Sequence, residues 1–147
     1  MPAKSGTTFA SVTISFFIHS TEDEVRLVEG VSKALGISKD SFVLDNLQGH
    51  HGNTLRSAKA HIIGNEANRI SKYILGTLDL PSKNTVVSEL EKSVDEHDAL
   101  YLRLDRQLLS QKLALSAEEP IRVKLKPTNR FENRRAIKDA YLELLKS

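Results

Sequence analysis

The stretch VLDNLQGHHGNTLRSAKAHII, residues 43–63, contains two extended segments that flank a short polar turn. Gly49 and Gly52 accept positive φ at no steric cost and Asn53 accepts it better than most residues, so GHHGN has the chemistry of a turn. After this turn, apolar and polar residues alternate: Ala58, Ala60 and Ile62 against Ser57, Lys59 and His61. Such alternation is typical of a strand with one covered and one solvated face. The stretch therefore predicts a β-hairpin with a basic outer face.

Three further segments show the same period of two and predict strands. Their apolar positions are Val12, Ile14, Phe16 and Ile18 in residues 9–19; Leu100, Leu102 and Leu104 in residues 98–107; and Ile121, Val123 and Leu125 in residues 121–126. Pro127 follows the last of them and is expected to end it. Together with the hairpin, the sequence predicts five strands.

Between the strands, apolar residues recur every three or four positions and predict helices. The first helix is expected to open at a capping box that begins at Thr21 and to stop at Gly36. Two more are expected over residues 65–77 and after Pro81. The last helix is expected to be capped by Asn129.

The order of these elements indicates an α+β fold. Strands come in neighbouring runs separated by helices, and each strand has one apolar face. The economical packing is therefore an antiparallel or mixed β-sheet with the helices packed on one face. The sequence shows no internal repeat, low-complexity tract or linker, and we expect residues 1–147 to form a single domain.

Composition limits the compartment and the chemistry. The chain contains no cysteine, which excludes disulfides and thiolate zinc sites. Residues 1–8 are mostly polar, and nowhere do about 18 apolar residues follow one another, so we expect no membrane partner and a cytoplasmic protein. The formal net charge is only +2, which favours an anionic partner weakly. The distribution matters more, because Arg and Lys are concentrated over residues 103–138.

If the alternation holds, the solvated face of the sheet concentrates positive charge. The residues expected there are Lys59, His61, Tyr101, Arg103, Arg122, Lys124 and Lys126, with the carboxylate of Asp105 beside them. Asp105 is also expected to cap the turn that follows it, and Arg130 comes shortly after the last strand. One interpretation is an ordinary solvated face, but such faces normally mix signs. A nearly uniform sign favours an anionic ligand.

His50 and His51, together with His61 on the next strand, allow three interpretations. Imidazoles bind zinc, copper or nickel, but neighbouring strand residues point to opposite faces and no HExxH helix is present, so no metal site is expected. The second interpretation is contact with RNA by stacking on a base or donating to phosphate, and the third is a solvated polar loop. The chain has no nucleophile motif, phosphate-binding glycine loop or isolated carboxylate pair, so neither an enzyme nor a cofactor is expected.

Three motifs carry a resemblance to a known family: GHHGN at residues 49–53, LRLDRQ at residues 102–107, and IRVKLK followed by a proline and a helix. They resemble the archaeal family of RNA-binding proteins or predicted exosome subunits. The family pattern is matched by Gly49, His50, His51, Gly52 and Asn53, and by Arg103, Asp105, Arg106 and Gln107. The resemblance implies the fold of the ribosomal protein that binds 5S rRNA, an antiparallel sheet with helices on one face.

Our first hypothesis is a non-catalytic RNA-binding protein that holds structured RNA on the open sheet face and the loop at residues 49–53. The expected contacts are His50, His51, Lys59, His61, Tyr101, Arg103, Arg122, Lys124, Lys126 and Arg130. Because Tyr101 is the main outward aromatic residue, phosphate and 2′-hydroxyl contacts should outweigh base stacking. The partners considered are RNA, exosome or ribosomal proteins, and a second copy of the chain as a homo-oligomer. The alternative is a protein-interaction module that docks an acidic partner.

Overall fold

The computed structural model describes residues 6–48, 54–116, 118 and 120–146. Within these residues, one antiparallel sheet of five strands has the order β2-β3-β1-β5-β4. The strands are β1 (Phe9–His19), β2 (Phe42–Gln48), β3 (Thr54–Ile63), β4 (Leu100–Leu104) and β5 (Ile121–Pro127). The first strand of the sequence therefore lies at the centre, and the expected α+β class with an antiparallel sheet is confirmed.

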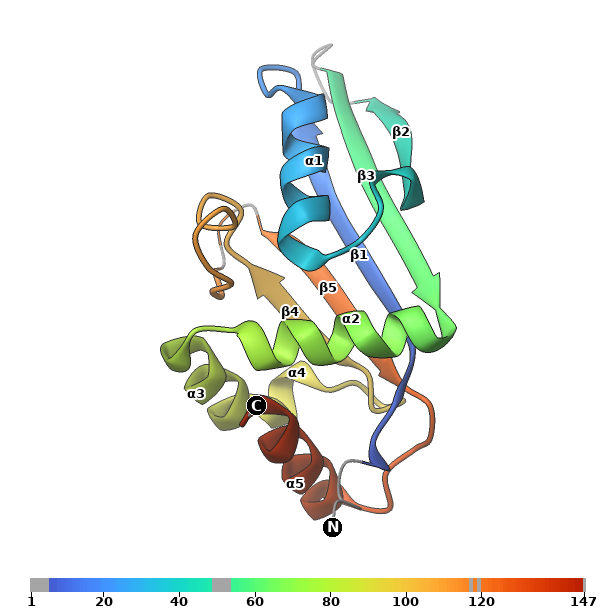
Figure 1. Ribbon diagram of the computed structural model, residues 1–147, viewed down its shortest axis with the longest axis vertical. Coiled ribbons are helices and arrows are strands. Elements are labelled where there is room, and N and C mark those ends of the chain that lie inside the picture. Colours follow the sequence, from blue (N-terminus) through green and yellow to red (C-terminus); the bar gives the residue numbers. More distant parts are fainter. Residues whose placement is uncertain (1–5, 49–53, 117, 119, 147) are drawn as a thin grey trace.

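The helices cover one face of this sheet. They are α1 (Glu24–Leu35), α2 (Gly64–Thr77), α3 (Leu80–Ser88), α4 (Leu90–Ser93) and α5 (Arg134–Leu145), with a short 3-10 turn, η2, at Lys39–Ser41. In Figure 1, α1 lies in front of the upper part of the sheet, α2 crosses its lower part, and α3 and α5 lie at the lower end of the molecule. Within the described residues, no helix packs on the opposite face of the sheet, which we call the open face.

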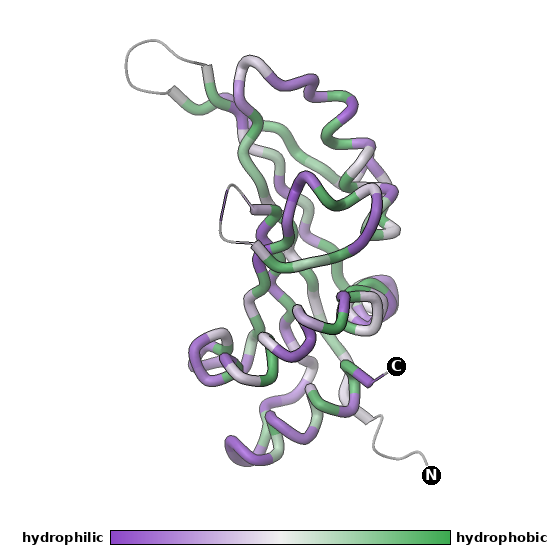
Figure 2. The backbone as a smooth tube through the Cα atoms, turned by 90° about the vertical axis from the view of Figure 1, so that its left-hand side faces the viewer, coloured by the Kyte–Doolittle hydropathy of each residue, from purple (hydrophilic) through white to green (hydrophobic). Residues whose placement is uncertain are grey.

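The alternation within each strand decides which side chains enter the core, and it can be followed as alternating hydropathy along the tube in Figure 2. Val12, Ile14, Phe16 and Ile18 of β1 are at most 3% exposed. The register places Ile14 between Ala60 of β3 and Val123 of β5, which are also buried. Burial of a large apolar side chain stabilises the fold by about 1.5–3 kcal/mol.

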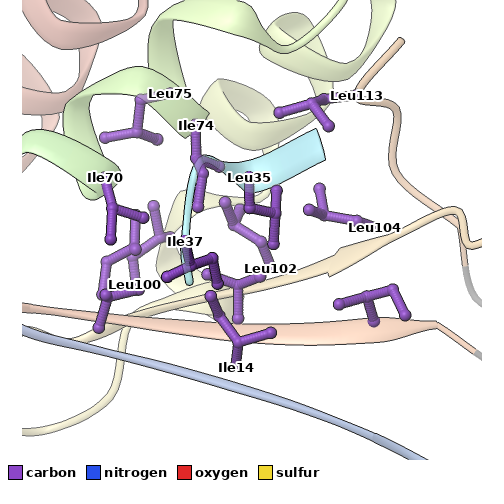
Figure 3. Close-up of a cluster of buried hydrophobic side chains, with 14 of the residues drawn as sticks. Ile14, Leu35, Ile37, Ile70, Ile74, Leu75, Leu100, Leu102, Leu104 and Leu113 are labelled. Carbon is purple, nitrogen blue, oxygen red and sulfur yellow. The ribbon is translucent and has the colours of Figure 1, made fainter. Parts of the chain in front are cut away.

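The core lies between the sheet and the helices. Figure 3 shows Ile14 and Leu102 of the sheet facing Leu35 of α1 and Ile70 and Ile74 of α2. Because β1, β4 and two helices meet in one cluster, segments distant in sequence fix the position of the sheet. The helices are therefore packed on one face of the sheet, and its other face can carry a site.

The hairpin expected over residues 43–63 is confirmed, since β2 and β3 pair from Phe42 with Ala60 to Gln48 with Thr54. Residues 49–53, which include His50 and His51, lie outside the described residues. At its other end, β3 passes directly into α2 at Gly64. The φ of Gly64 is 73°, a conformation that glycine adopts without a steric cost. This turn sends α2 back across the sheet, where it packs on β1.

Two helix starts differ from the expectation. The carboxylate of Asp23, and not Thr21, caps α1 by accepting a hydrogen bond from the N–H of Arg26 at 3.2 Å. Asn133, and not Asn129, caps α5 by accepting from the N–H of Ala136 at 2.8 Å. All four residues are of types that suit a cap, so the sequence leaves the choice open. For α5 a tertiary contact decides, because the N–H of Phe131 donates to the buried Asp98 at 2.8 Å and keeps the preceding segment out of the helix.

Candidate nucleic-acid interface

The strand register aligns the residues of the open face in rows that cross the sheet. One row contains, from β2 to β4, Val43, Lys59, Ser15, Arg122 and Arg103. Arg122 and Arg103 are directly opposed on β5 and β4. Like charges in directly opposed positions destabilise a sheet, so this arrangement has a cost in the absence of an anion.

The next row contains His61, Thr13, Lys124 and Tyr101, and Lys126 lies one row further along β5. The Oγ1 of Thr13 and the Nδ1 of His61 are 2.8 Å apart, and the Nζ of Lys124 lies 5.6 Å from the centroid of the Tyr101 ring. The structure therefore brings together on one face seven of the predicted residues: Lys59, His61, Tyr101, Arg103, Arg122, Lys124 and Lys126. We call the five Lys and Arg residues of this set the basic face.

The Lys and Arg residues of the basic face differ from other cations of the chain in their salt-bridge partners. Arg56 pairs with Glu24 at 2.6 Å, and Arg106 pairs with Glu22 at 3.0 Å. Among the residues that the structure describes, no residue of the basic face forms a salt bridge. Its charges therefore remain available to an anion such as a phosphate.

One carboxylate, that of Asp95, reaches the border of the basic face. Its Oδ2 accepts a hydrogen bond from the hydroxyl of Tyr101 at 2.8 Å, and its Oδ1 accepts from the N–H groups of His97 and Ala99. Burial raises the pKa of Asp95, but these hydrogen bonds and the charge of Lys124 outweigh it, so the pKa lies below its ordinary value. Asp95 is therefore ionised at neutral pH and holds the Tyr101 ring in place beside Lys124.

A second aromatic residue, Phe17, lies on the open face and was not assigned to a face by sequence reasoning. Its side chain is 39% exposed, and the guanidinium of Arg122 lies 5.5 Å from the centroid of its ring. The alternation of β1 was the signal that could have found it, because Phe17 is two residues beyond Ser15. Among the described residues, the open face therefore offers the rings of Phe17 and Tyr101, each beside a cation.

The open face is not basic throughout. Val43 is 63% exposed and Leu47 is 37% exposed on β2, where Asp45 lies between them, and Ile63 at the end of β3 is 68% exposed. The expectation of a nearly uniform positive face is therefore wrong for β2. The physical reason is the sequence VLDNLQ of β2, in which the residues of the open face, Val43, Asp45 and Leu47, are apolar or acidic. The positive charge of this face is therefore confined to β3, β5 and β4.

Two predicted positions have local partners. The Nε of Arg130 lies 3.3 Å from Oδ2 of Asp98, and its Nη2 donates to the carbonyl of Glu96 at 2.7 Å. Asp105 accepts from the N–H groups of Gln107 at 2.9 Å and Leu108 at 3.2 Å, which confirms the expected cap of this turn. Arg130 is therefore held beside the loop that precedes β4.

Within the residues that the structure describes, no three His, Asp or Glu side chains gather in an arrangement that could hold a metal ion. In the same part of the chain, no helix has the length and apolar character needed to cross a membrane.

The fold and sequence are similar to those of archaeal proteins. Over 104 residues, the chain is 28% identical to an uncharacterized protein of Methanocaldococcus jannaschii, with 66% of this chain and 68% of that protein covered. A solved protein from Archaeglobus fulgidus is 25% identical to this chain and has a TM-score of 0.73. The match covers 92% of this chain and 99% of that protein. A solved protein from Sulfolobus solfataricus is 23% identical to this chain and also has a TM-score of 0.73. The match covers 92% of this chain and 96% of that protein, and it shows the fold alone. Both solved proteins are described as members of a domain-of-unknown-function family.

Residues 11–127 match the model of a family described as RNA binding. This span extends from β1 to the end of β5 and contains the whole basic face. The match covers most of the chain. The protein therefore belongs to this archaeal RNA-binding family.

Proposed function

We propose that this protein is a non-catalytic RNA-binding protein that holds structured RNA on the basic face. The observation that carries the proposal is the row of cations across β3, β5 and β4, none of which has a carboxylate partner among the described residues. Membership of a family described as RNA binding supports RNA as the anion. Contact between Lys or Arg and phosphate supplies affinity that does not depend on base sequence.

The dimensions of the sheet support contact with more than one phosphate. Neighbouring strands are about 4.8 Å apart, so the row from Lys59 to Arg103 spans about 14 Å across three strand spacings. Lys124 and Lys126 extend the charge along β5, at right angles to this row. The basic face is thus a broad patch, which suits the shape of folded RNA better than a narrow groove would. His61 and Tyr101 lie within it, whereas Arg130, His50 and His51 would contribute from segments beyond the strands.

A second candidate is an assembly module that docks an acidic partner or a second copy of the chain. The observation in its favour is the exposed apolar pair Val43 and Leu47 on β2, the strand at one edge of the sheet. Exosome and ribosomal proteins are the partners of this kind that we consider. The basic face would then meet acidic side chains in place of phosphates.

Fluorescence anisotropy with a labelled stem-loop RNA tests the first proposal. We expect Lys124→Ala combined with Lys126→Ala to weaken RNA binding by about tenfold, because two phosphate contacts are lost. The thermal midpoint should change little, since substitution of solvent-facing residues usually costs less than about 0.5 kcal/mol. The matched control is Lys33→Ala combined with Lys138→Ala, which removes the same charge from α1 and α5.

DNA of the same sequence is the second arm of the experiment. We expect weaker binding of DNA, because the 2′-hydroxyl and the A-form shape are absent. Equal affinity for RNA and DNA, or an equal loss in both double variants, would leave the basic face an ordinary solvated surface. Protein that purifies free of nuclease-sensitive absorbance at 260 nm and gains mass with a protein partner would favour the assembly module.

A further inference from the structure

The outer edge of β4 presents a pair of backbone groups that point away from β5. The carbonyl of Arg103 accepts a hydrogen bond from the N–H of Ser116 at 2.9 Å, so the backbone groups of Arg103 face outward. In an antiparallel strand, the backbone N–H and C=O groups of every second residue point to the same side. The backbone groups of Tyr101 therefore also point away from β5. Among the described residues, neither the carbonyl of Tyr101 nor the N–H of Arg103 has a hydrogen-bond partner. One acceptor and one donor therefore stand side by side.

Both ends of this short edge are closed. Val94 forms a bridge with Leu100, and Leu104 forms a bridge with Leu115. A strand in a sheet is usually about 3–10 residues long, so the open stretch between the bridges is too short to pair with an added strand. An occupant of the stretch must be compact, and it must offer its own donor and acceptor within a small space.

A cavity of about 760 Å³ opens at this stretch. It is lined by the edge of β4, by α3 with Asp79 and Glu89 at its two ends, by Lys92 and Ser93, and by residues 112 and 114–116. Leu115 is half-buried and supplies apolar surface, whereas Val86 and Leu102 behind it are at most 3% exposed. Lys112 is a further cation, and its Nζ lies 3.2 Å from Asp79. Pockets for small molecules have volumes of about 300–1,000 Å³, mostly apolar walls and a few fixed polar groups. We call this cavity, with the free carbonyl of Tyr101 and N–H of Arg103, the edge notch.

The edge notch adjoins the basic face. The side chains of Tyr101 and Arg103 lie on the open face, opposite Lys124 and Arg122, and the same two residues also line the cavity, toward which the outward backbone groups of β4 point. A strand of RNA whose phosphates rest on Arg103 and Arg122 therefore has the notch within reach at the rim of the sheet.

We propose that the edge notch binds one unpaired nucleobase of the RNA, an inference that rests on the proposed function. A nucleobase is planar, its faces are apolar enough to lie against the half-buried Leu115, and its Watson–Crick edge has a donor next to an acceptor. The carbonyl of Tyr101 accepts from the N–H of the base, and the N–H of Arg103 donates to its ring nitrogen or carbonyl. Lys92, at the same cavity, faces the phosphate of that nucleotide. The RNA favoured by this protein then combines a folded part with at least one unpaired base.

A pair of tryptophan variants on α3 separates the notch from the basic face. Thr85 lines the cavity and is exposed, so Thr85→Trp fills the space of the base, whereas Asn84→Trp adds the same bulk outside the lining. The ligands are an RNA hairpin with an unpaired loop and a blunt RNA duplex of the same composition. We expect Thr85→Trp to weaken hairpin binding by about tenfold, the effect of losing about 1.4 kcal/mol, and to leave duplex binding unchanged. Asn84→Trp should alter neither.

The two proposals fail in different ways. If Thr85→Trp affects hairpin and duplex equally, or neither of them, the edge notch is not a base site. If Lys124→Ala with Lys126→Ala binds both RNAs as the wild type does, the proposed function fails instead.

An NMR titration tests the notch without the basic face. We expect the amide resonance of Arg103 to shift on addition of adenosine or uridine 5′-monophosphate and not on addition of ribose 5-phosphate, because only the nucleotides carry a base. The shift should persist in Lys124→Ala with Lys126→Ala. An unchanged Arg103 amide, or an equal shift with ribose 5-phosphate, overturns the inference.

Discussion

Arg103 and Arg106 show how environment separates two residues of the same type within one motif, LRLDRQ. The side chain of Arg106 is only 10% exposed, and its Nη1 lies 3.0 Å from both carboxylate oxygens of Glu22. Its Nη2 donates to the carbonyl of Phe17 at 2.8 Å. Arg103, three residues earlier, is exposed on the basic face with no carboxylate partner among the described residues. We infer a structural role for Arg106 and a ligand-binding role for Arg103.

At the residue scale we predict that Glu22→Gln destabilises the fold by about 1–3 kcal/mol at pH 7, because a nearly buried guanidinium loses its anion. Burial raises the pKa of Glu22, but hydrogen bonds from His19 and Arg106 and the charge of Arg106 outweigh it, so the pKa is lowered. A lowered pKa gives stability that is present above the unfolded value of about 4.3 and is lost as pH falls through the folded value. The difference in the free energy of unfolding between Glu22→Gln and the wild type should therefore shrink as pH falls below about 4.

Urea denaturation between pH 7 and pH 3 measures this difference. Glu66→Gln is the control, because its pair with Arg69 is exposed on the surface of α2 and should contribute less than about 1 kcal/mol. Equal losses in the two variants, or a Glu22→Gln effect that grows as pH falls, would contradict the assigned role of the Arg106 ion pair.

At the scale of elements, the start of α5 is decided by a contact with Asp98, which lies in the loop before β4 and is distant in sequence. Asp98 is 6% exposed, has a positive φ of 68°, and holds both the N–H of Phe131 and the guanidinium of Arg130. The segment after β5 is therefore tied to the loop before β4, and the helix begins only at Arg134. The same contacts hold Arg130 in place.

We predict that Asn133→Ala lowers the free energy of unfolding by about 1 kcal/mol, the usual cost of removing an N-cap side chain. Asn129→Ala should stay within about 0.5 kcal/mol, as surface substitutions usually do. Chemical denaturation of the two variants measures the effect. The reverse order would place the cap at Asn129, as sequence reasoning alone expected.

At the scale of the whole molecule, a formal net charge of only +2 conceals a strong local asymmetry. Carboxylates pair with cations such as Arg56, Arg106 and Arg134, whereas the basic face has none of these pairs among the described residues. The potential near β4 and β5 is therefore positive although the chain is nearly neutral. Local charge, and not net charge, governs the expected response to salt.

We predict that the logarithm of RNA affinity falls with the logarithm of salt concentration at a slope of about −3 to −5, because each phosphate contact contributes about 0.7–0.9. Arg122→Ala should make the slope shallower by about one. Anisotropy titrations at several salt concentrations measure both slopes. Arg130→Ala, measured in parallel, decides whether this more distant residue also contacts phosphate. A slope near zero in the wild type would contradict phosphate binding by the basic face.

The sequence by itself determined the strands, most of the helices and the side of each strand that enters the core. The alternation of residues 9–19 and of residues 121–126 is a local property, and in a strand it fixes the face of every side chain. For this reason Lys59, Arg103, Arg122 and Lys124 could be assigned to one face before the fold was known. Phe17 could have been assigned in the same way.

Only the tertiary structure decided which of these residues meet. The strand order places β5 between β1 and β4 and so sets Arg122 opposite Arg103, although 18 residues separate them in the chain. The ion pair of Arg106, the start of α5 and the edge notch also depend on contacts between distant segments. The physical reason is that the alternation of apolar and polar residues depends only on neighbours in the sequence. The order of the strands and the bridges that close the edge of β4 depend on how distant segments pack around one common core.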